Sequence, residues 1–401
     1  MKASPSSSAA SAVARRAVIS AASATRDAAD GAASRLAGAG VPVVRALGAG
    51  RDQIRPHVEG SPHLRHGRFV NAEPPSPPIE SDGSVLRELL RRPGRPMRSV
   101  RVLTPAFTAP GFDDDRADLA ATWLGHATVL VELDGVRILT DPVLSRRCSP
   151  SELVGPARLH PAPAPVAALP AVDVVLISHD HYDHLDYETI AAIAATRPEV
   201  LFVAPLGVGA HLEAWGISPE RIRQADWDQS LTLTVGRAER ALTFTCCPAR
   251  HFSGRFLDRN LTQWASWAVR GPSHSFFFSG DTGFTERFAD TGAAVGPFDL
   301  TLIAIGAYDP LWPDIHLNPE EAIAVHRMLS GSSVGDAVMM PIHWGTFNLA
   351  RHTWADPVRR VLPSAQSNAA TVLIPPPGGR IDLVHRTGDG LADPAWWERS
   401  A

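Results

Sequence analysis

Three histidines and three aspartates lie within residues 179–186, in the stretch "ISHDHYDHLD" that follows an apolar run at residues 174–177. His179 and His181 are two positions apart, so in an extended segment their side chains point to the same side and can chelate one ion. Asp183 and His184 belong to the turn beyond and are free to face a second ion. The stretch therefore predicts a metal site at the end of a buried strand.

Three more apolar runs, each with the pattern of a strand, are followed by a histidine or an aspartate. The residues at these ends are His251, Asp281 and His343. Strands of a rigid sheet can present such residues to one crevice although they are far apart in the sequence. The candidate metal ligands are therefore His179, His181, Asp183, His184, His251, Asp281 and His343.

These seven side chains suit two divalent ions that share one carboxylate. Imidazole and carboxylate ligands without a thiolate favour Zn²⁺, with iron and manganese as alternatives. A site short of its full coordination number leaves a place for water, which is typical of catalytic rather than structural metals. Two ions about 3.5–4 Å apart can hold a hydroxide between them and promote attack on a phosphoester or a carbonyl. We therefore predict two Zn²⁺ per chain and a hydrolytic reaction.

The composition argues against several classes of protein. Charged residues make up 20% of the 401 residues and the formal net charge is −4, so we expect no nucleic-acid partner. No apolar stretch approaches the roughly 20 residues of a membrane-spanning helix. The three cysteines include the adjacent pair Cys246 and Cys247 and leave no even disulfide framework. We expect a cytoplasmic protein with at most peripheral membrane contact, and the sequence leaves its oligomeric state open.

The chain divides into two regions by composition. Residues 1–80 are rich in Ala, Ser and Arg and close with the proline-rich stretch "NAEPPSPPIESDG", which predicts a partly disordered N-terminal extension and a stiff linker. Residues 81–401 are predicted to form the catalytic domain.

Short apolar runs and helical segments alternate from residue 118 onward, which predicts an α/β domain with many strands. Residues 122–133 and 136–143 indicate a hairpin around Asp134-Gly135. Asn318 is a natural helix N-cap, Pro319 fits the first helical position, and Glu321 completes a capping box.

The order of the ligand motifs resembles that of a known superfamily. The pattern "HDHYDH", followed by a lone His, the Asp of "SGDTG" and the His of "HWGTF", resembles the metallo-β-lactamase-fold hydrolases. The longer stretches "TWLGHATVLVELDGVRILTDPV", "GPFDLTLIAIGAYDPLW" and "IHWGTFNLA" are similar to the N-acyl-phosphatidylethanolamine-hydrolysing phospholipase D branch. The resemblance covers about residues 120–355. It implies a four-layer αββα sandwich with the metals along one edge of its two sheets.

The resemblance also implies an assignment of the ligands. One zinc ion would be held by His179, His181 and His251, and the second by Asp183, His184 and His343. Asp281 would bridge them. Diiron redox relatives typically carry Glu in place of the second histidine, so the retained His181 argues against oxygen reduction.

The implied reaction is hydrolysis of a phosphodiester in an N-acyl-phosphatidylethanolamine-like phospholipid by a metal-bridging hydroxide. Asp183, Asp281 and His316 are the candidate catalytic residues. The alternatives are a lactone or amide hydrolase with the same site and a non-catalytic metal-binding protein. A lipid-like substrate is therefore the expected small-molecule partner.

Three further polar residues are candidates for roles around the metals. Asp141 either caps a turn or accepts a hydrogen bond from a ligand histidine. His126 is either an ordinary buried histidine or a neighbour of the metals. His316 either precedes the cap of the next helix or faces the substrate, where it could protonate the leaving oxygen.

Large apolar side chains near the ligands mostly indicate core packing. Those that lie in loops just past ligands or strand ends are candidates for a wall that accommodates an acyl chain. These are Phe252, Phe256, Trp312 and Phe347. Among the arginines after the third strand end, Arg250, Arg255 and Arg259 are either phosphate ligands or exposed surface residues.

Overall fold

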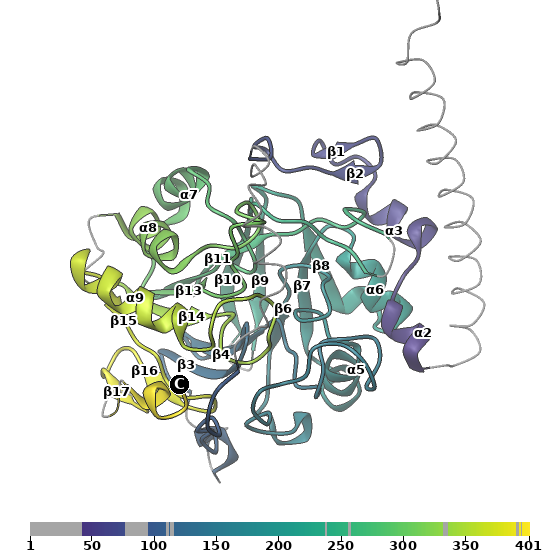
Figure 1. The fold of residues 1–401 in the computed structure, drawn as a ribbon. Coiled ribbons are helices and arrows are strands. Elements are labelled where there is room, and N and C mark those ends of the chain that lie inside the picture. The colour runs from purple at the N-terminus through teal and green to yellow at the C-terminus, as the bar shows by residue number, and fades with distance from the viewer. Residues whose placement is uncertain are drawn as a thin grey trace, which may run out of the picture.

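The computed structural model describes residues 42–76, 95–109, 112, 116–236, 239–255, 258–331, 336–389, 393 and 395–401. Two large β-sheets face each other, with α7, α8 and α9 on one outer side and α5 and α6 on the other (Figure 1). The predicted α/β sandwich with helices outside both sheets is confirmed. Because each sheet buries one face against the other, the interior of the sandwich is apolar and the metal ligands can lie only at its edge.

The first sheet holds eight strands within the described residues, in the order β17-β16-β3-β4-β5-β6-β7-β8. Their bounds are β3 (Leu119–Gly125), β4 (Thr128–Leu133), β5 (Val136–Thr140), β6 (Val174–Leu176), β7 (Leu201–Pro205), β8 (Ile222–Ala225), β16 (Arg380–Asp382) and β17 (Thr387–Gly388). Strands β5 to β8 are parallel, so their carboxyl ends meet at one edge.

The second sheet holds seven strands within the same described ranges, in the order β15-β14-β13-β12-β11-β10-β9. Their bounds are β9 (Ser230–Val235), β10 (Arg240–Cys247), β11 (Ser266–Arg270), β12 (Ser275–Phe278), β13 (Leu300–Ala304), β14 (Val338–Ile342) and β15 (Thr371–Val372). Strands β12 to β15 are parallel. The carboxyl ends of β12 and β14 therefore also share an edge.

The predicted hairpin around Asp134-Gly135 is confirmed, since Leu133 pairs with Val136 across positive-φ turn residues. Its first strand differs from the prediction. Residues 122–133 form parts of two antiparallel strands, β3 and β4, rather than one. The chain reverses at Gly125 and His126, whose φ angles are 103° and 53°. This left-handed turn carries the side chain of His126 to the edge of the sheet.

The helices cover the outer faces of the sheets. Their bounds are α2 (Pro42–Leu47), α3 (Arg51–Val58), α5 (Tyr187–Thr196), α6 (Val208–Ala214), α7 (Arg287–Val295), α8 (Pro319–Ser330) and α9 (Asp356–Ser367). Short 3-10 turns lie at η1 (Ala106–Thr108), η2 (Val166–Ala168), η3 (Pro219–Arg221) and η5 (Trp396–Arg399). Among the helices that the structure describes, none has both the length and the apolar character needed to cross a bilayer.

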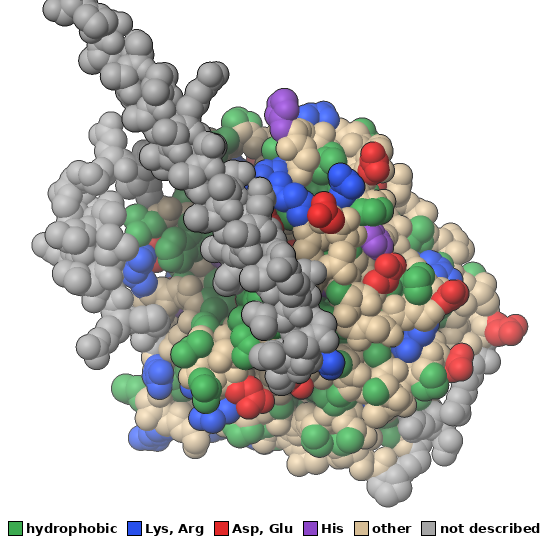
Figure 2. Space-filling model, turned by 90° about the vertical axis from the view of Figure 1, so that its right-hand side faces the viewer, with side chains coloured by type: hydrophobic (Ala, Val, Ile, Leu, Met, Phe, Trp, Pro, Cys, Tyr) green, Lys and Arg blue, Asp and Glu red, His purple; other side chains and the backbone are tan. Residues whose placement is uncertain are grey.

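Residues 42–76, which belong to the predicted N-terminal extension, pack against the sandwich. Ile54, Val58 and Phe69 are buried in the main core, and β1 (Leu64–Arg65) pairs with β2 (Arg68–Phe69). The remainder of the predicted extension, residues 1–41 and 77–80, lies outside the described residues, and the boundary at residue 80 stays a prediction. On the face that carries α2, α3, α5 and α6, the described acidic and basic side chains are interspersed (Figure 2).

The capping box predicted at α8 is confirmed. Asn318 Oδ1 accepts a hydrogen bond from Glu321 N at 3.0 Å, and Glu321 Oε2 accepts one from Asn318 N at 2.9 Å. These bonds satisfy groups that the first turn of a helix otherwise leaves unpaired.

We predict that Asn318→Ala lowers the free energy of unfolding by about 1 kcal/mol, because the cap is lost while the core is untouched. Urea denaturation measures this change. Asn318→Ser, which keeps an acceptor oxygen, should recover most of the stability. Equal destabilisation by both variants would show that the cap oxygen is not the cause.

Candidate metal centre

Three imidazole rings meet in the first half of the site. His179 and His181 follow β6, and His251 follows β10. His181 Nδ1 lies 2.8 Å from His179 Nε2 and 3.3 Å from His251 Nε2. The ligand atoms of these three residues lie within 4.8 Å of one another. They are the same three histidines that the resemblance groups around one ion.

Hydrogen bonds on the far side of two of these rings direct a lone pair into the site. His251 Nδ1 lies 2.8 Å from the carbonyl oxygen of Ile315, which can only accept, so His251 Nε2 carries the lone pair. Ser178 Oγ donates to Asp141 and therefore accepts from His179 Nδ1, 2.9 Å away. His179 Nε2 is then also unprotonated. Neutral rings held in this way are the form in which histidine binds a metal.

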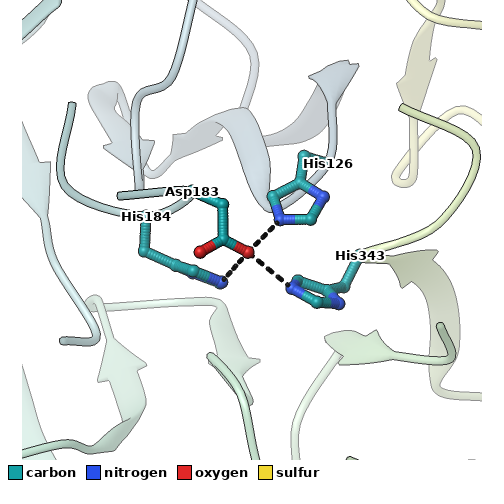
Figure 3. A group of neighbouring side chains, drawn as sticks. All are labelled: His126, Asp183, His184 and His343. Carbon is teal, nitrogen blue, oxygen red and sulfur yellow. Dashed lines mark hydrogen bonds and ion pairs between the residues drawn. The ribbon is translucent and has the colours of Figure 1, made fainter. Parts of the chain in front are cut away.

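The second half of the site consists of Asp183, His184 and His343, with His126 beside them (Figure 3). Asp183 Oδ2 lies 3.0 Å from His126 Nε2, 3.4 Å from His343 Nε2 and 3.5 Å from His184 Nε2. His343 follows β14 with a φ of 61°, and its N–H donates to the carbonyl of His126. A Cβ on Gly306 would lie 2.2 Å from the carbonyl oxygen of His343, so only glycine allows this close approach.

Asp281, which follows β12, lies between the two halves. Its Oδ2 is 3.7 Å from His251 Nε2 in the first half and 3.2 Å from His184 Nε2 in the second. Its Oδ1 is 3.1 Å from His343 Nε2. A single buried carboxylate therefore faces ligand atoms of both groups.

The donor set fits divalent cations. His184 Nδ1 lies 2.6 Å from Asp141, and its Nε2 faces the carboxylates of Asp183 and Asp281. Both His184 Nε2 and Asp281 Oδ1 are buried and lack a hydrogen-bond partner in the described part of the chain. Burial lowers the pKa of His184, but Asp281, Asp183 and Asp141 outweigh it and hold that pKa well above its usual value. The carboxylates therefore favour positive charge at this position, which a divalent metal ion would supply.

The structure places the three further polar candidates close to this centre. Asp141 accepts from His184 and from both the N–H and the hydroxyl of Ser178. Burial, together with repulsion from His343, lowers the pKa of His126 to about 3, so its neutral ring donates from Nε2 to Asp183. His316 Nδ1 is 3.8 Å from Asp281, and burial lowers the pKa of His316 to about 4.

The candidate wall residues lie in different surroundings. The ring of Phe252 packs against His181 and His251, with centroids 4.5 and 4.8 Å away. Phe347 is buried with its edge toward His126 at 5.1 Å. Trp312 donates from Nε1 to Ala307 O in the loop before His316. Phe256 lies outside the described residues.

Neither alternative for the arginines after β10, a phosphate ligand or an exposed surface residue, fits Arg255. Its guanidinium is buried and donates to the carbonyls of Asp180, Leu185 and Ala46. Arg250 pairs with Asp314 at 2.8 Å. The ring of Phe252 lies under Arg259, with the guanidinium 4.2 Å from its centroid. Arg255 therefore fastens the ligand loop to the N-terminal segment instead of facing a substrate.

Sequence analysis missed two residues that hold the ligand loops in place. Asp180 points away from its neighbours His179 and His181, as alternation in an extended segment requires, and accepts from Gly254 N at 2.6 Å and Thr262 Oγ1 at 2.8 Å. The position of Asp180 inside the "HDH" motif could have identified this residue from the sequence. Asn71 Nδ2 donates to His251 O at 2.8 Å, and its Oδ1 accepts from His251 N at 3.0 Å. No local pattern marks Asn71.

Comparisons with known proteins agree with this geometry. A family model described as a β-lactamase superfamily domain matches residues 136–344, and those residues include all seven ligand candidates. The chain belongs to the metallo-β-lactamase superfamily. It is a metal-dependent hydrolase of that superfamily, with several clusters of potential metal ligands at the edge of its sheets.

Relatives of this chain include an uncharacterized protein and a named phospholipase. An uncharacterized protein of Mycobacterium tuberculosis is 49% identical over 358 residues, which cover 88% of this chain and 91% of that protein. N-acyl-phosphatidylethanolamine-hydrolyzing phospholipase D 1 of Caenorhabditis elegans is 40% identical over 249 residues, which cover 60% of this chain and 67% of that protein. The crystal structure of isothiocyanate hydrolase from Delia radicum gut bacteria has the same fold, with a TM-score of 0.50 at 19% identity over 65% of this chain and 98% of that chain.

We predict that Asn71→Ala weakens metal retention by roughly 10-fold, because partners that orient a ligand commonly contribute this much to metal affinity. Transfer of metal to a chromophoric chelator measures the change. Asn368→Ala is the matched control, since Asn368 also makes side-chain hydrogen bonds but follows α9. Equal metal retention in both variants, at similar melting temperatures, would contradict the role of Asn71.

Proposed function

We propose that this hydrolase uses two zinc ions to cleave a phosphodiester bond in an N-acyl-phosphatidylethanolamine-like phospholipid. The observation that carries the proposal is the position of Asp281, whose carboxylate faces His251 on one side and His184 and His343 on the other. A shared carboxylate is what two neighbouring divalent ions need. In this proposal His179, His181 and His251 hold one ion, and Asp183, His184 and His343 hold the other.

The choice of substrate is supported by the named relative. The phospholipase D of Caenorhabditis elegans is 40% identical to this chain, and its printed name specifies N-acyl-phosphatidylethanolamine hydrolysis. The aligned part spans 67% of that protein, so it is long enough to include a complete domain of this fold. We extend the same substrate class to this chain as a proposal.

Zinc ions bound in this way would supply an activated water and stabilise negative charge on the phosphoryl oxygens. The side chains around the site hold the candidate ligands in position. His126 fixes Asp183, and Asp141 fixes His184, so the ligand atoms keep their directions. His316 lies beside Asp281 with a lowered pKa, which favours a neutral ring that hydrogen-bonds to the substrate over one that delivers a proton. Phe252 and Phe347 supply apolar surface close to the two halves.

We predict that Asp281→Asn lowers metal content and turnover together, with metal affinity at least roughly 10-fold weaker, because one neutral amide replaces the shared charge. Elemental analysis and turnover are measured on the same preparation. His316→Ala is the comparison variant, and it should lower turnover while both metals stay bound. Full activity and full metal content in Asp281→Asn would refute the shared role.

We also predict the position of bond cleavage. Hydrolysis of N-acyl-phosphatidylethanolamine in ¹⁸O-labelled water should place the label in phosphatidic acid, because the attack is at phosphorus. Label in the N-acylethanolamine would indicate attack at carbon. The same preparation is tested on aryl phosphodiesters, acyl lactones and amides, and activity confined to lactones or amides would replace the proposed function by that alternative.

A further inference from the structure

An arginine-lined groove lies beside the second half of the metal centre, in the loop region of residues 144–162. Its volume is about 390 Å³. Leu144, Leu159 and Pro161 give it apolar walls, and Arg146 and Arg158 add two guanidinium groups. The combination of aliphatic walls and cationic groups suits an amphiphilic anion.

The guanidinium of Arg158 makes no direct ion pair with a carboxylate of the described residues, although Asp186 acts on it from farther away. Its Nη1 and Nη2 donate only to the backbone carbonyls of Val143 and Leu124, at 3.4 and 3.1 Å, and its buried Nε has no hydrogen-bond partner among the described residues. Burial lowers the pKa of Arg158 to about 10, so the group remains charged at neutral pH. A partly desolvated guanidinium without a direct ion pair costs free energy, and an anion bound in the groove would offset that cost.

The rim of the groove is also cationic. Arg146 is exposed, and no ion pair of its side chain occurs within the part of the chain that the structure describes. Residues 144–162 contain three arginines and a single acidic residue, Glu152, although the whole chain has a formal charge of −4. This segment therefore carries a local positive charge.

Two exposed aliphatic side chains extend from the same segment. Leu153 is 87% exposed and its neighbour Val154 is 65% exposed. Arg147 holds the base of this loop, since its guanidinium donates to the carbonyls of Glu152 and Gly155. Exposed aliphatic side chains in the same segment as Arg146 and Arg158 match a phospholipid surface, in which acyl chains lie beneath a layer of phosphates. A small soluble anion would gain nothing from these aliphatic side chains.

Side-chain contacts connect the groove to the metal centre. His160 Nε2 lies 3.1 Å from Thr346 Oγ1, which accepts from His126 N at 2.7 Å. The guanidinium of Arg158 lies 5.5 Å from the centre of the Phe347 ring, and the edge of that ring packs against His126. A lipid bound in the groove would therefore be one layer of side chains away from His126 and Asp183.

We propose that residues 144–162 dock the protein on an anionic phospholipid surface, with a headgroup phosphate between Arg146 and Arg158 and with Leu153 and Val154 in the bilayer. The docking site deepens the proposed function. It rests on the proposed function only for its purpose, which is to bring the metal centre to a substrate in a membrane. The docking itself requires no reaction.

The test is co-sedimentation of the metal-loaded full chain with vesicles of phosphatidylcholine, with and without phosphatidylglycerol. We expect binding to the anionic vesicles that weakens as salt is added. Arg146→Glu and Leu153→Asp should each weaken this binding by about fivefold or more. The matched controls are Arg240→Glu and Met97→Asp, which change an exposed arginine and an exposed aliphatic side chain outside the loop and should bind as the parent protein does.

Three outcomes would overturn the docking site. The first is equal binding of the parent protein to neutral and anionic vesicles, and the second is unchanged binding by both loop variants. The third is an absence of vesicle binding together with stabilisation by inorganic phosphate of the parent protein but not of Arg146→Glu. That result would assign the groove to a soluble anion. Melting temperature and metal content of every variant show that the fold is intact. Vesicle binding by a protein that cleaves no phosphodiester would refute the proposed function and leave the docking site standing.

Discussion

Seven candidate ligand side chains, five of them buried, must be held with their ligand atoms facing the same small volume. His184 Nε2 faces the carboxylates of Asp183 and Asp281, and three histidine nitrogens meet on the other side of Asp281. Without a cation this arrangement is unfavourable, because buried groups that lack a partner keep their full desolvation cost. Much of the architecture at the edge of the sheets can be understood as a response to this constraint.

The response is a layer of hydrogen bonds behind the ligands. Asp141 fixes His184, Asp180 ties the loop after β6 to the loop after β10, and the carbonyl of Ile315 fixes His251. Each bond selects one ring nitrogen or one loop conformation, so the ligand atoms are oriented before a metal arrives. Hydrogen bonds to charged groups, such as those of Asp141 and Asp180, contribute about 1.5–3 kcal/mol each, which is enough to hold the ligand loops in place when several act at once.

Residues 42–76 contribute hydrogen bonds to this layer, although their composition predicted a partly disordered extension. Asn71 clamps the backbone of His251, and Ala46 accepts from Arg255. Ala49 N donates to His211, which in turn faces Asp180. The N-terminal segment is thus joined to the ligand loops by polar contacts and to the core by Ile54 and Phe69.

The sequence by itself determined the candidate ligands, the strands that carry them and the capped helix α8, because each depends on spacing within a few residues. It also identified Asp141 and His126 as candidate neighbours of the metals. The tertiary structure decided the rest. The split of residues 122–133 at His126, the inward turn of Arg255 and the clamp of Asn71 on His251 across 180 positions all depend on the path of the folded chain. Local patterns carry no information about such contacts, since the partners meet only after both sheets have formed.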